Sequence, residues 1–402
     1  MTISPPAAEL ASLWSRHHAR WRDGAQVASQ WSEAAETDPK LLRSRTSGPW
    51  WELLDQLGIT LLVTREYEHL AMALSVDDGQ PAASFMRLPH PSGLVADRER
   101  GVVHVASTRN PNQLFTFAPV ERTLARADMP PPALERRPLV PVGTRFYPGA
   151  LYMHDLALIG GELHANAVGQ NAVVRLGEHG ATRVWWPRAV EDEDGVPDCS
   201  LNYLQVNSIA AGETLASSCF SASSAHVSAR RPGHRNYPVD GRGVIFDGAT
   251  REPLASGLTR PHSARFDAGE LWVDNSGYGE VGPVAGGAFE PRARLGSWTR
   301  GLVFCGDVAF VGVSRVIPRY RQYAPGLEVE RSVCGVVALQ RDSGAELARL
   351  TWPYGNQIFA LDWLPRMTSG GFPFAAGRRV SSDSKHLFYS FLPSTHEEFQ
   401  HT

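Results

Sequence analysis

One strand–turn–strand pattern recurs along this chain, and it constrains the fold more than any other feature of the sequence. Each copy contains a polar residue, a short apolar run, a turn with glycine or aspartate, and a second apolar run. The clearest copy is LTRPHSARFDAGELWVDNSGYGE at 258–280, and weaker copies lie at 92–107, 154–166, 207–218 and 299–314. Such self-similarity is typical of proteins built from repeated supersecondary units.

Aligning the copies on their turns places one polar residue at the start of each first strand. These lead residues are Ser92, His154, Asn207, His262 and Arg300, and QIFALDWLP supplies a sixth, Gln357. The last copy lacks a second strand, whereas 57–76 has strands but no lead residue. Since a propeller blade of four strands needs roughly 40 to 50 residues, we predict an all-β fold, a six-bladed β-propeller. A C-terminal strand would close its ring and remove the open sheet edges.

The chain divides into three predicted regions. We expect a helical N-terminal extension at 1–56, the propeller at 57–365, and a partly flexible C-terminal tail at 366–402. The N-terminal helices either brace the ring, which is the simpler interpretation, or form an arm that binds a protein partner. A long polar insertion at 222–242 is a second candidate for a partner-binding loop.

Two further segments have a predicted structure. The proline-rich segment at 111–150 is expected to be a long connection, and HLFYSFL at 386–392 is expected to be a last strand.

Composition and motifs exclude several function classes. The net charge is −3 and basic residues are dispersed, so we expect no nucleic-acid partner. No run has the length of a signal peptide or membrane span, and the four cysteines are scattered, which favours a reduced, cytoplasmic protein without membrane attachment. The GxGxxG pattern in NSGYGEVGP is followed by Pro283 and not by a helix, so no nucleotide cofactor is expected.

The lead residues are the candidate functional site. Because the innermost strands of a propeller surround the central channel, their first residues are expected to meet there although they are distant in sequence. His154 and His262 could bind one divalent metal ion (Zn, Fe or Cu) or act as acid and base. Arg300 could hold a carboxylate or stabilise developing negative charge.

Other polar and aromatic residues complete the predicted site. Asn207 and Gln357 would orient water or substrate, and Ser92, Trp272 and Glu280 are further predicted substrate-binding residues. Asp155 and Asp274 are candidate hydrogen-bond partners for the two histidines.

Several of these motifs together resemble a family of bacterial proteins known by a domain-of-unknown-function label. They include HDLA from His154, VNSIA around Asn207, PHSAR from Pro261 and TRGLVF from Thr299, and the resemblance extends over roughly 57–365. It implies a propeller fold and supplies no reaction. Family members carry a histidine two residues before the asparagine strand, where this chain has Gln205. If the family site is a three-histidine cluster, this chain has a changed ligand set or has lost the metal.

Two functions are compatible with the sequence. The first is an enzyme that binds a small polar or peptide-like substrate at the channel mouth. The second is a non-catalytic scaffold that holds a protein or ligand partner.

Overall fold

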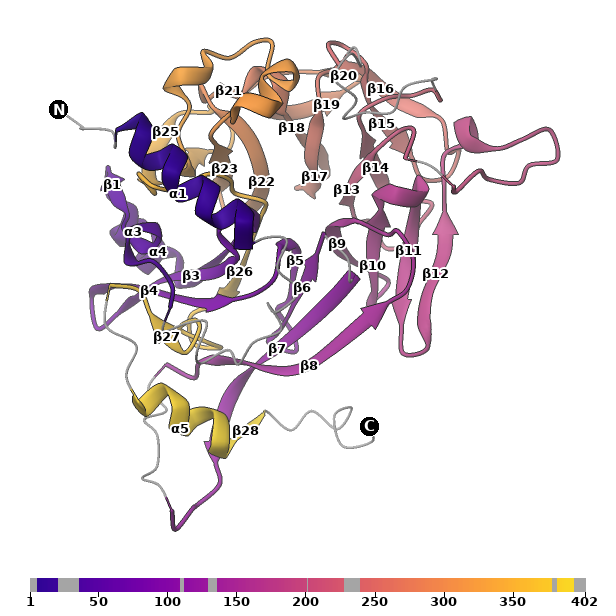
Figure 1. Cartoon of the computed structure of the whole chain (residues 1–402). Helices are drawn as coiled ribbons and strands as arrows, with labels where there is room; N and C mark the ends of the chain where they lie inside the picture. Colours follow the sequence, from indigo (N-terminus) through magenta and orange to yellow (C-terminus); the bar gives the residue numbers. More distant parts are fainter. Residues whose placement is uncertain are drawn as a thin grey trace.

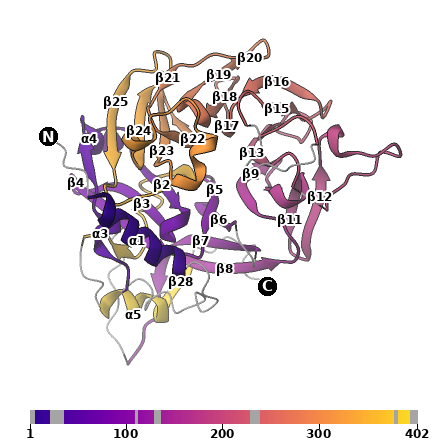
Figure 2. The same ribbon diagram turned by 45° about the horizontal axis from the view of Figure 1, so that its top comes forward.

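The repeated hairpins form six antiparallel sheets arranged as the blades of a propeller, which confirms the predicted fold (Figure 1). The computed structural model describes residues 6–20, 36–108, 112–128, 136–200, 202–227, 239–377 and 382–393. In each sheet the strand that carries a lead residue near its start, or follows one, lies innermost. These six strands are neighbours around the ring in the order β5, β9, β13, β17, β22 and β26, all labelled in Figure 1 and, except for β26, also in Figure 2.

The first blade closes the ring by joining distant parts of the chain, as predicted. Its strands are β26 (Ala360–Pro365), β2 (Ile59–Arg65), β3 (Leu70–Asp77), β4 (Gln80–Arg87) and β27 (Phe374–Ala375). The innermost strand β26 pairs antiparallel with β2 from Ile59 opposite Pro365 to Thr64 opposite Ala360. The C-terminal part of the chain therefore supplies a strand that the N-terminal part lacks.

The next three blades follow in chain order. The second contains β5 (Pro91–Asp97), β6 (Val102–Ser107), β7 (Asn112–Thr123), β8 (Leu139–Tyr147) and β28 (Phe391–Pro393). The third contains β9 (Met153–Ile159), β10 (Glu162–Ala167), β11 (Ala172–Gly177) and β12 (Gly180–Trp185). The fourth contains β13 (Val206–Ala210), β14 (Cys219–Ala222), β15 (Gly243–Asp247) and β16 (Pro253–Leu258).

The last two blades complete the ring. The fifth contains β17 (Pro261–Asp267), β18 (Glu270–Asn275), β19 (Glu280–Ala285), β20 (Ala288–Phe289) and β21 (Ala293–Arg294). The sixth contains β22 (Trp298–Cys305), β23 (Val308–Ser314), β24 (Gly335–Gln340), β25 (Glu346–Thr351) and β1 (Arg45–Ser47).

The N-terminal helices pack against the propeller. They are α1 (Ala7–Arg20), α3 (Pro39–Leu42) and α4 (Trp50–Leu57). Leu13, Trp50 and Leu54 are buried in one apolar cluster with strands of the ring, and α4 contacts β2, β3 and β25. Gly58 ends α4 in the left-handed conformation, with φ of 64°, which glycine adopts at low cost. This packing agrees with the bracing interpretation.

Two segments differ from expectation. The segment predicted as a long connection contains β7 and β8, which are paired from Asn112 opposite Tyr147 to Pro119 opposite Leu139. At the C-terminal end, α5 (Ser382–Ser390) precedes the short strand β28, so only Phe391–Pro393 is extended where a longer strand was expected. Of the insertion at 222–242, residues 228–238 lie outside the described part of the chain. None of the helices described is both long and apolar enough to cross a membrane.

Candidate functional site

A cavity of about 290 Å³ opens at the mouth of the channel where the innermost strands begin. Loops between second and third strands also reach it, because these loops lie at the same end of each blade as the start of the innermost strand. They contribute Tyr67, Thr108 and Val168. The 3₁₀ turn η6 (Pro318–Tyr323) adds Tyr320 and Tyr323. The channel mouth, where the lead residues were predicted to meet, is thus a concave surface lined by polar and aromatic side chains.

Two of the six lead residues line this cavity. His154 is half-buried and its Nδ1 lies 3.5 Å from Nη2 of Arg300. The Arg300 guanidinium carbon lies 3.4 Å from the centre of the Phe359 ring, and the His154 ring meets the same phenyl group edge to face. The structure therefore brings together His154 and Arg300, which are far apart in sequence.

The guanidinium of Arg300 is buried at the channel mouth. Only 5% of the residue is exposed, and it forms no ion pair with a carboxylate among the described residues. Burial lowers the pKa of Arg300 to about 10, and the negative charge of Glu66 opposes that shift. A guanidinium has five N–H donors, and the contact with His154 uses one of them.

His262 lies next to this cavity but does not line it. It is 3% exposed, and its Nδ1 is within hydrogen-bond distance of the Arg260 carbonyl oxygen (2.9 Å) and of Ser276 Oγ (3.1 Å). Burial and the charges of Arg300 and Arg260 hold the pKa of His262 well below its ordinary value. Its ring packs edge to face on Trp298, which lines the cavity. His262 is therefore a neutral side chain behind the cavity wall.

Two of the remaining lead residues, Ser92 and Asn207, form hydrogen bonds to neighbouring strands. Ser92 donates to the carbonyl oxygens of Met153 (2.7 Å) and Ala106 (3.0 Å), and Asn207 Oδ1 accepts from Ser221 Oγ (2.6 Å). Asn207 Nδ2, His262 Nε2 and Gln357 Oε1 are buried and have no hydrogen-bond partner among the described residues. Buried polar atoms are usually paired, so Asn207 Nδ2 as a donor and Gln357 Oε1 as an acceptor could bond a bound water or ligand, as could the His262 ring nitrogen.

Sequence reasoning missed a second set of site residues, which lie two positions before the lead residues. Tyr152, Gln205 and Arg260 line the cavity, and all three have the left-handed backbone conformation, with φ of 52°, 55° and 56°. His90, at the equivalent place, has φ of 47°. Residues other than glycine rarely adopt this conformation, and when they do they cluster at functional sites. The sequence contained one signal for this set: Gln205 occupies the position at which members of the resembled family carry a histidine.

Arg260 is the second cation of the cavity. Its Nη1 donates to Gln205 Oε1 and to Ser223 Oγ (3.0 Å), and its guanidinium carbon lies 4.5 Å from the centre of the Tyr323 ring. These contacts fix the orientation of the side chain. Arg260 thus adds positive charge to the cavity while part of its donor capacity is used by the protein.

Trp272 and Glu280 are not placed with the other predicted residues. Trp272 is buried in an apolar cluster with residues of β22, β23 and β24, and its ring packs on Phe304. Glu280 accepts from Asn275 Nδ2 (2.8 Å) and forms an ion pair with Arg294. Both residues belong to strands behind the innermost one, so their side chains meet the rest of the blade or its neighbour.

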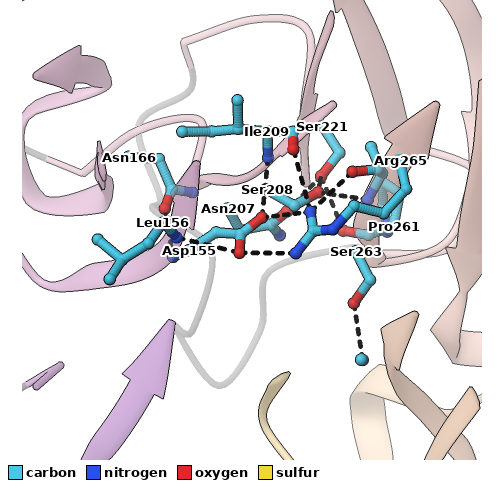
Figure 3. A network of polar contacts seen from close by, with 12 residues as sticks. Asp155, Leu156, Asn166, Asn207, Ser208, Ile209, Ser221, Pro261, Ser263 and Arg265 are labelled. Atoms are coloured by element: carbon cyan, nitrogen blue, oxygen red, sulfur yellow. Dashed lines mark hydrogen bonds and ion pairs between the residues drawn. The ribbon is translucent and has the colours of Figure 1, made fainter. Parts of the chain in front are cut away.

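Neither of the two aspartates predicted to orient the histidines is hydrogen-bonded to one. Asp274 lies opposite His262 in the strand pair, but both oxygens of its fully buried carboxyl group lack a hydrogen-bond partner among the described residues. Asp155 accepts two hydrogen bonds from Arg265 (2.7 and 2.9 Å) and one from the backbone N–H of Ile209 (3.0 Å), as Figure 3 shows. This network connects β9, β13 and β17 at the deeper part of the channel. Neither carboxylate contacts a histidine ring.

The described residues do not fit a metal site with three or more protein ligands. They contain no group of three His, Cys, Asp or Glu side chains that could hold an ion. Of the two predicted ligands, His262 already uses Nδ1, and the charges of Arg260 and Arg300 act on its ring. Because neighbouring positive charge opposes cation binding, a metal held by His154 and His262 stays a prediction that elemental analysis can test.

A second cavity, of about 380 Å³, lies at the opposite end of the innermost strands. Its lining is mainly apolar and includes Leu94, Leu156 and Ile209. Its charged residues are paired, since Arg98 binds Asp362 and Arg265 binds Asp155. The two ends of the channel therefore differ in how their charged side chains are paired. The cavity at the His154 end contains Arg300, which is not in an ion pair with a carboxylate among the described residues.

Comparison with known proteins identifies the family of this chain. The chain belongs to the family described as Domain of unknown function (DUF4915), whose model matches residues 48–371. No curated protein matches the chain.

Solved structures of low sequence identity resemble it. A nidogen/laminin complex has 11% identity and a TM-score of 0.48, covering 76% of this chain and 98% of that one. A protein of unknown function from Bacteroides caccae has 9% identity and a TM-score of 0.47, with 76% and 98% covered. A gluconolactonase from Xanthomonas campestris has 13% identity and a TM-score of 0.41, with 74% and 86% covered. At these values the similarities carry no argument about activity.

Proposed function

We propose that this member of the DUF4915 family is an enzyme that binds a small anionic substrate in the cavity lined by His154 and Arg300. The observation that carries the proposal is the Arg300 guanidinium, which is buried at the channel mouth without a carboxylate in an ion pair among the described residues. Burying a charge is costly unless a partner compensates it. A substrate carboxylate or phosphate would provide that partner through charge-assisted hydrogen bonds.

His154 is the proposed proton donor. A guanidinium group can only donate hydrogen bonds, so the contact with Arg300 favours the tautomer in which His154 Nδ1 accepts and Nε2 carries the proton. A neutral imidazole can donate from Nε2 to an oxygen atom that becomes negatively charged during the reaction. Arg300 would stabilise the same charge, so the pair fits reactions that pass through an oxyanion.

The alternative, a non-catalytic binding module, predicts the same binding but no turnover. The packing of α1 and α4 on the ring supports a bracing role for residues 1–56 rather than a free arm for a protein partner. The insertion at 222–242 remains a candidate partner-binding loop under this alternative. A measurement of turnover separates the two functions.

Binding can be tested with simple anions before the substrate is identified. A ligand that binds the folded state raises its thermal stability, so wild-type protein should melt at a higher temperature with benzoate or phosphate than with chloride at equal ionic strength. Arg300→Gln should abolish this increase, because a hydrogen bond to a charged group contributes about 1.5–3 kcal/mol. The matched control is Arg175→Gln, which removes an exposed arginine paired with Glu162 (3.1 Å).

Catalysis is tested separately with a panel of carboxylate-bearing esters, lactones and β-substituted acids, with products followed by mass spectrometry. His154→Gln should lower turnover at least about a hundredfold, which is typical for loss of acid–base catalysis, while anion binding is retained. Equal stabilisation of wild type and Arg300→Gln would reject the anion site. Anion binding without turnover of any panel member would reject the enzyme in favour of the binding module.

A further inference from the structure

Aromatic side chains form much of the wall around Arg300. They come from the loop after β2, the segment before β9, the start of β22, the turn η6 and the segment before β26. These residues are Tyr67, Tyr152, Trp298, Tyr320, Tyr323 and Phe359. Trp298 packs on Tyr320 with ring centres 5.5 Å apart, and Tyr320 packs on Tyr323 at 5.6 Å. Such a wall offers a planar ring both apolar contact and favourable ring-to-ring geometry.

The charges of the cavity favour one negative charge on the ligand. Arg260 and Arg300 contribute two positive charges and Glu66 contributes one negative charge, so the three charged lining residues sum to +1. A monoanion would neutralise this sum, whereas a dianion would leave one uncompensated negative charge in a buried site. A cationic ligand, which an aromatic wall could otherwise attract, would be repelled by both arginines.

The cavity also limits the size of the ligand. Its volume of about 290 Å³ is roughly twice the ~150 Å³ of an apolar cavity that accommodates benzene. One aromatic ring with a short acidic side chain fits this space. Arg260 already donates to Gln205 and Ser223, so Arg300 is the main anchor for the acid.

From these three observations we infer that the ligand is an aromatic monocarboxylate, held by its carboxylate on Arg300 and by its ring against the aromatic wall. This inference rests on the proposed function, because it names the substrate class of the same site. It specifies two further properties of the ligand, an aromatic ring and a single negative charge, which the proposed function does not require.

The test measures calorimetric binding of four probes to the full chain. Phenylacetate represents the proposed class, phenylacetamide removes the charge, hexanoate removes the ring, and phenyl phosphate adds a second charge. Phenylacetate should bind at least about tenfold tighter than each of the others, a difference of about 1.4 kcal/mol. Phenylacetamide loses the charge-assisted hydrogen bonds and hexanoate loses the ring contacts, and the second negative charge of phenyl phosphate has no partner in the cavity. Arg300→Gln should remove the preference for phenylacetate over phenylacetamide, and Phe359→Leu should reduce the preference over hexanoate.

The outcomes distinguish this inference from the proposed function. If hexanoate or phenyl phosphate binds as tightly as phenylacetate, and Arg300→Gln weakens that binding, the aromatic monocarboxylate is wrong and the anion site stands. If none of the three anions binds in a manner that depends on Arg300, both are wrong. Arg300→Lys, which keeps the charge, and Arg175→Gln are included so that loss of folding in one variant does not decide the result.

Discussion

The carboxyl group of Asp274 is fully buried, and burial determines its charge. Desolvation holds the pKa of Asp274 well above its ordinary value of 3.8, although Ser263 and Arg265 oppose the shift. The folded protein therefore keeps this proton at pH values where the unfolded chain releases it. The resulting stability is fully present below the unfolded pKa and is lost as the pH rises towards the folded pKa.

Asp274→Asn should show this dependence directly. Asparagine resembles the neutral acid, so the difference in unfolding free energy between variant and wild type should move in favour of the variant as the pH rises from acidic to neutral. Within the window between the two pKa values, the slope is about 1.4 kcal/mol per pH unit. Urea unfolding of both proteins across that range measures it. A difference that does not vary with pH would contradict the assignment.

The prediction that His154 and His262 bind a divalent metal ion can be tested by replacing these two residues. If they bind a divalent ion, purified wild-type protein should contain about one equivalent of Zn, Fe or Cu, since such sites bind tightly. The His154→Ala/His262→Ala double variant should then lose it. Absence of stoichiometric metal from wild type, or an equal content in the double variant, would reject the metal. Arg300→Gln serves as a comparison that changes the cavity but neither histidine.

At the scale of strands, Asp155 and Arg265 connect three blades across the channel (Figure 3). The Asp155 side chain is 5% exposed and that of Arg265 is 20% exposed. Burial acts to lower the pKa of Arg265, but the charge and hydrogen bonds of Asp155 outweigh it, so that pKa is raised. The ion pair thus depends on both partners.

Asp155→Asn should destabilise the protein by about 3–5 kcal/mol, because it leaves the Arg265 charge buried without its partner. Replacing both residues by leucine should cost less than the sum of the two single replacements, because no charge is then left unpaired. A double-mutant cycle from denaturant unfolding measures this coupling. Additive single effects would show that the two side chains act independently.

The strands also explain which predictions from sequence were possible. The hairpin repeats were sufficient to predict the six blades and the closing strand, because apolar runs and turn residues indicate where strands form. The direction of the lead side chains was not predictable. A register shift follows close to the lead position in the pairs of β5 with β6, β13 with β14, β17 with β18 and β22 with β23. Such bulges change which side chains face the channel.

The left-handed residues before the strands have the same effect. From the alternation of side chains along a strand, His262 was predicted to face the channel. In the structure Arg260 and Gln205 line the cavity, and His262 does not. Their backbone conformation depends on contacts with segments distant in sequence, such as the Ser223 N–H after β14, which bonds the Gln205 carbonyl oxygen (3.4 Å). Trp272 and Glu280 lie outside the cavity lining for a simpler reason, since second and third strands of a blade lie away from the axis.

At the scale of the whole molecule, the ring depends on the pairing of β26 with β2. This contact joins residues about 300 positions apart, and it covers edges of the first blade that would otherwise be open to other chains. β28 comes later in the chain and pairs with β7 of the second blade, whereas Phe388 of α5 packs on Phe374 in the outermost strand of the first blade. The two C-terminal contributions should therefore differ in importance.

Two truncations separate these contributions. A chain ending at Gly377 keeps β26 and β27 and loses α5 and β28, and it should remain a monodisperse β-protein with reduced thermal stability. A chain ending at Asn356 also loses Gln357, Ile358, Phe359 and β26, so the first blade has an unpaired inner edge and the channel cavity lacks one wall. It should aggregate or unfold, as exposed strand edges predispose chains to do. Size-exclusion chromatography and circular dichroism measure both outcomes, and a folded, monodisperse chain ending at Asn356 would contradict the role of β26 in holding the ring together.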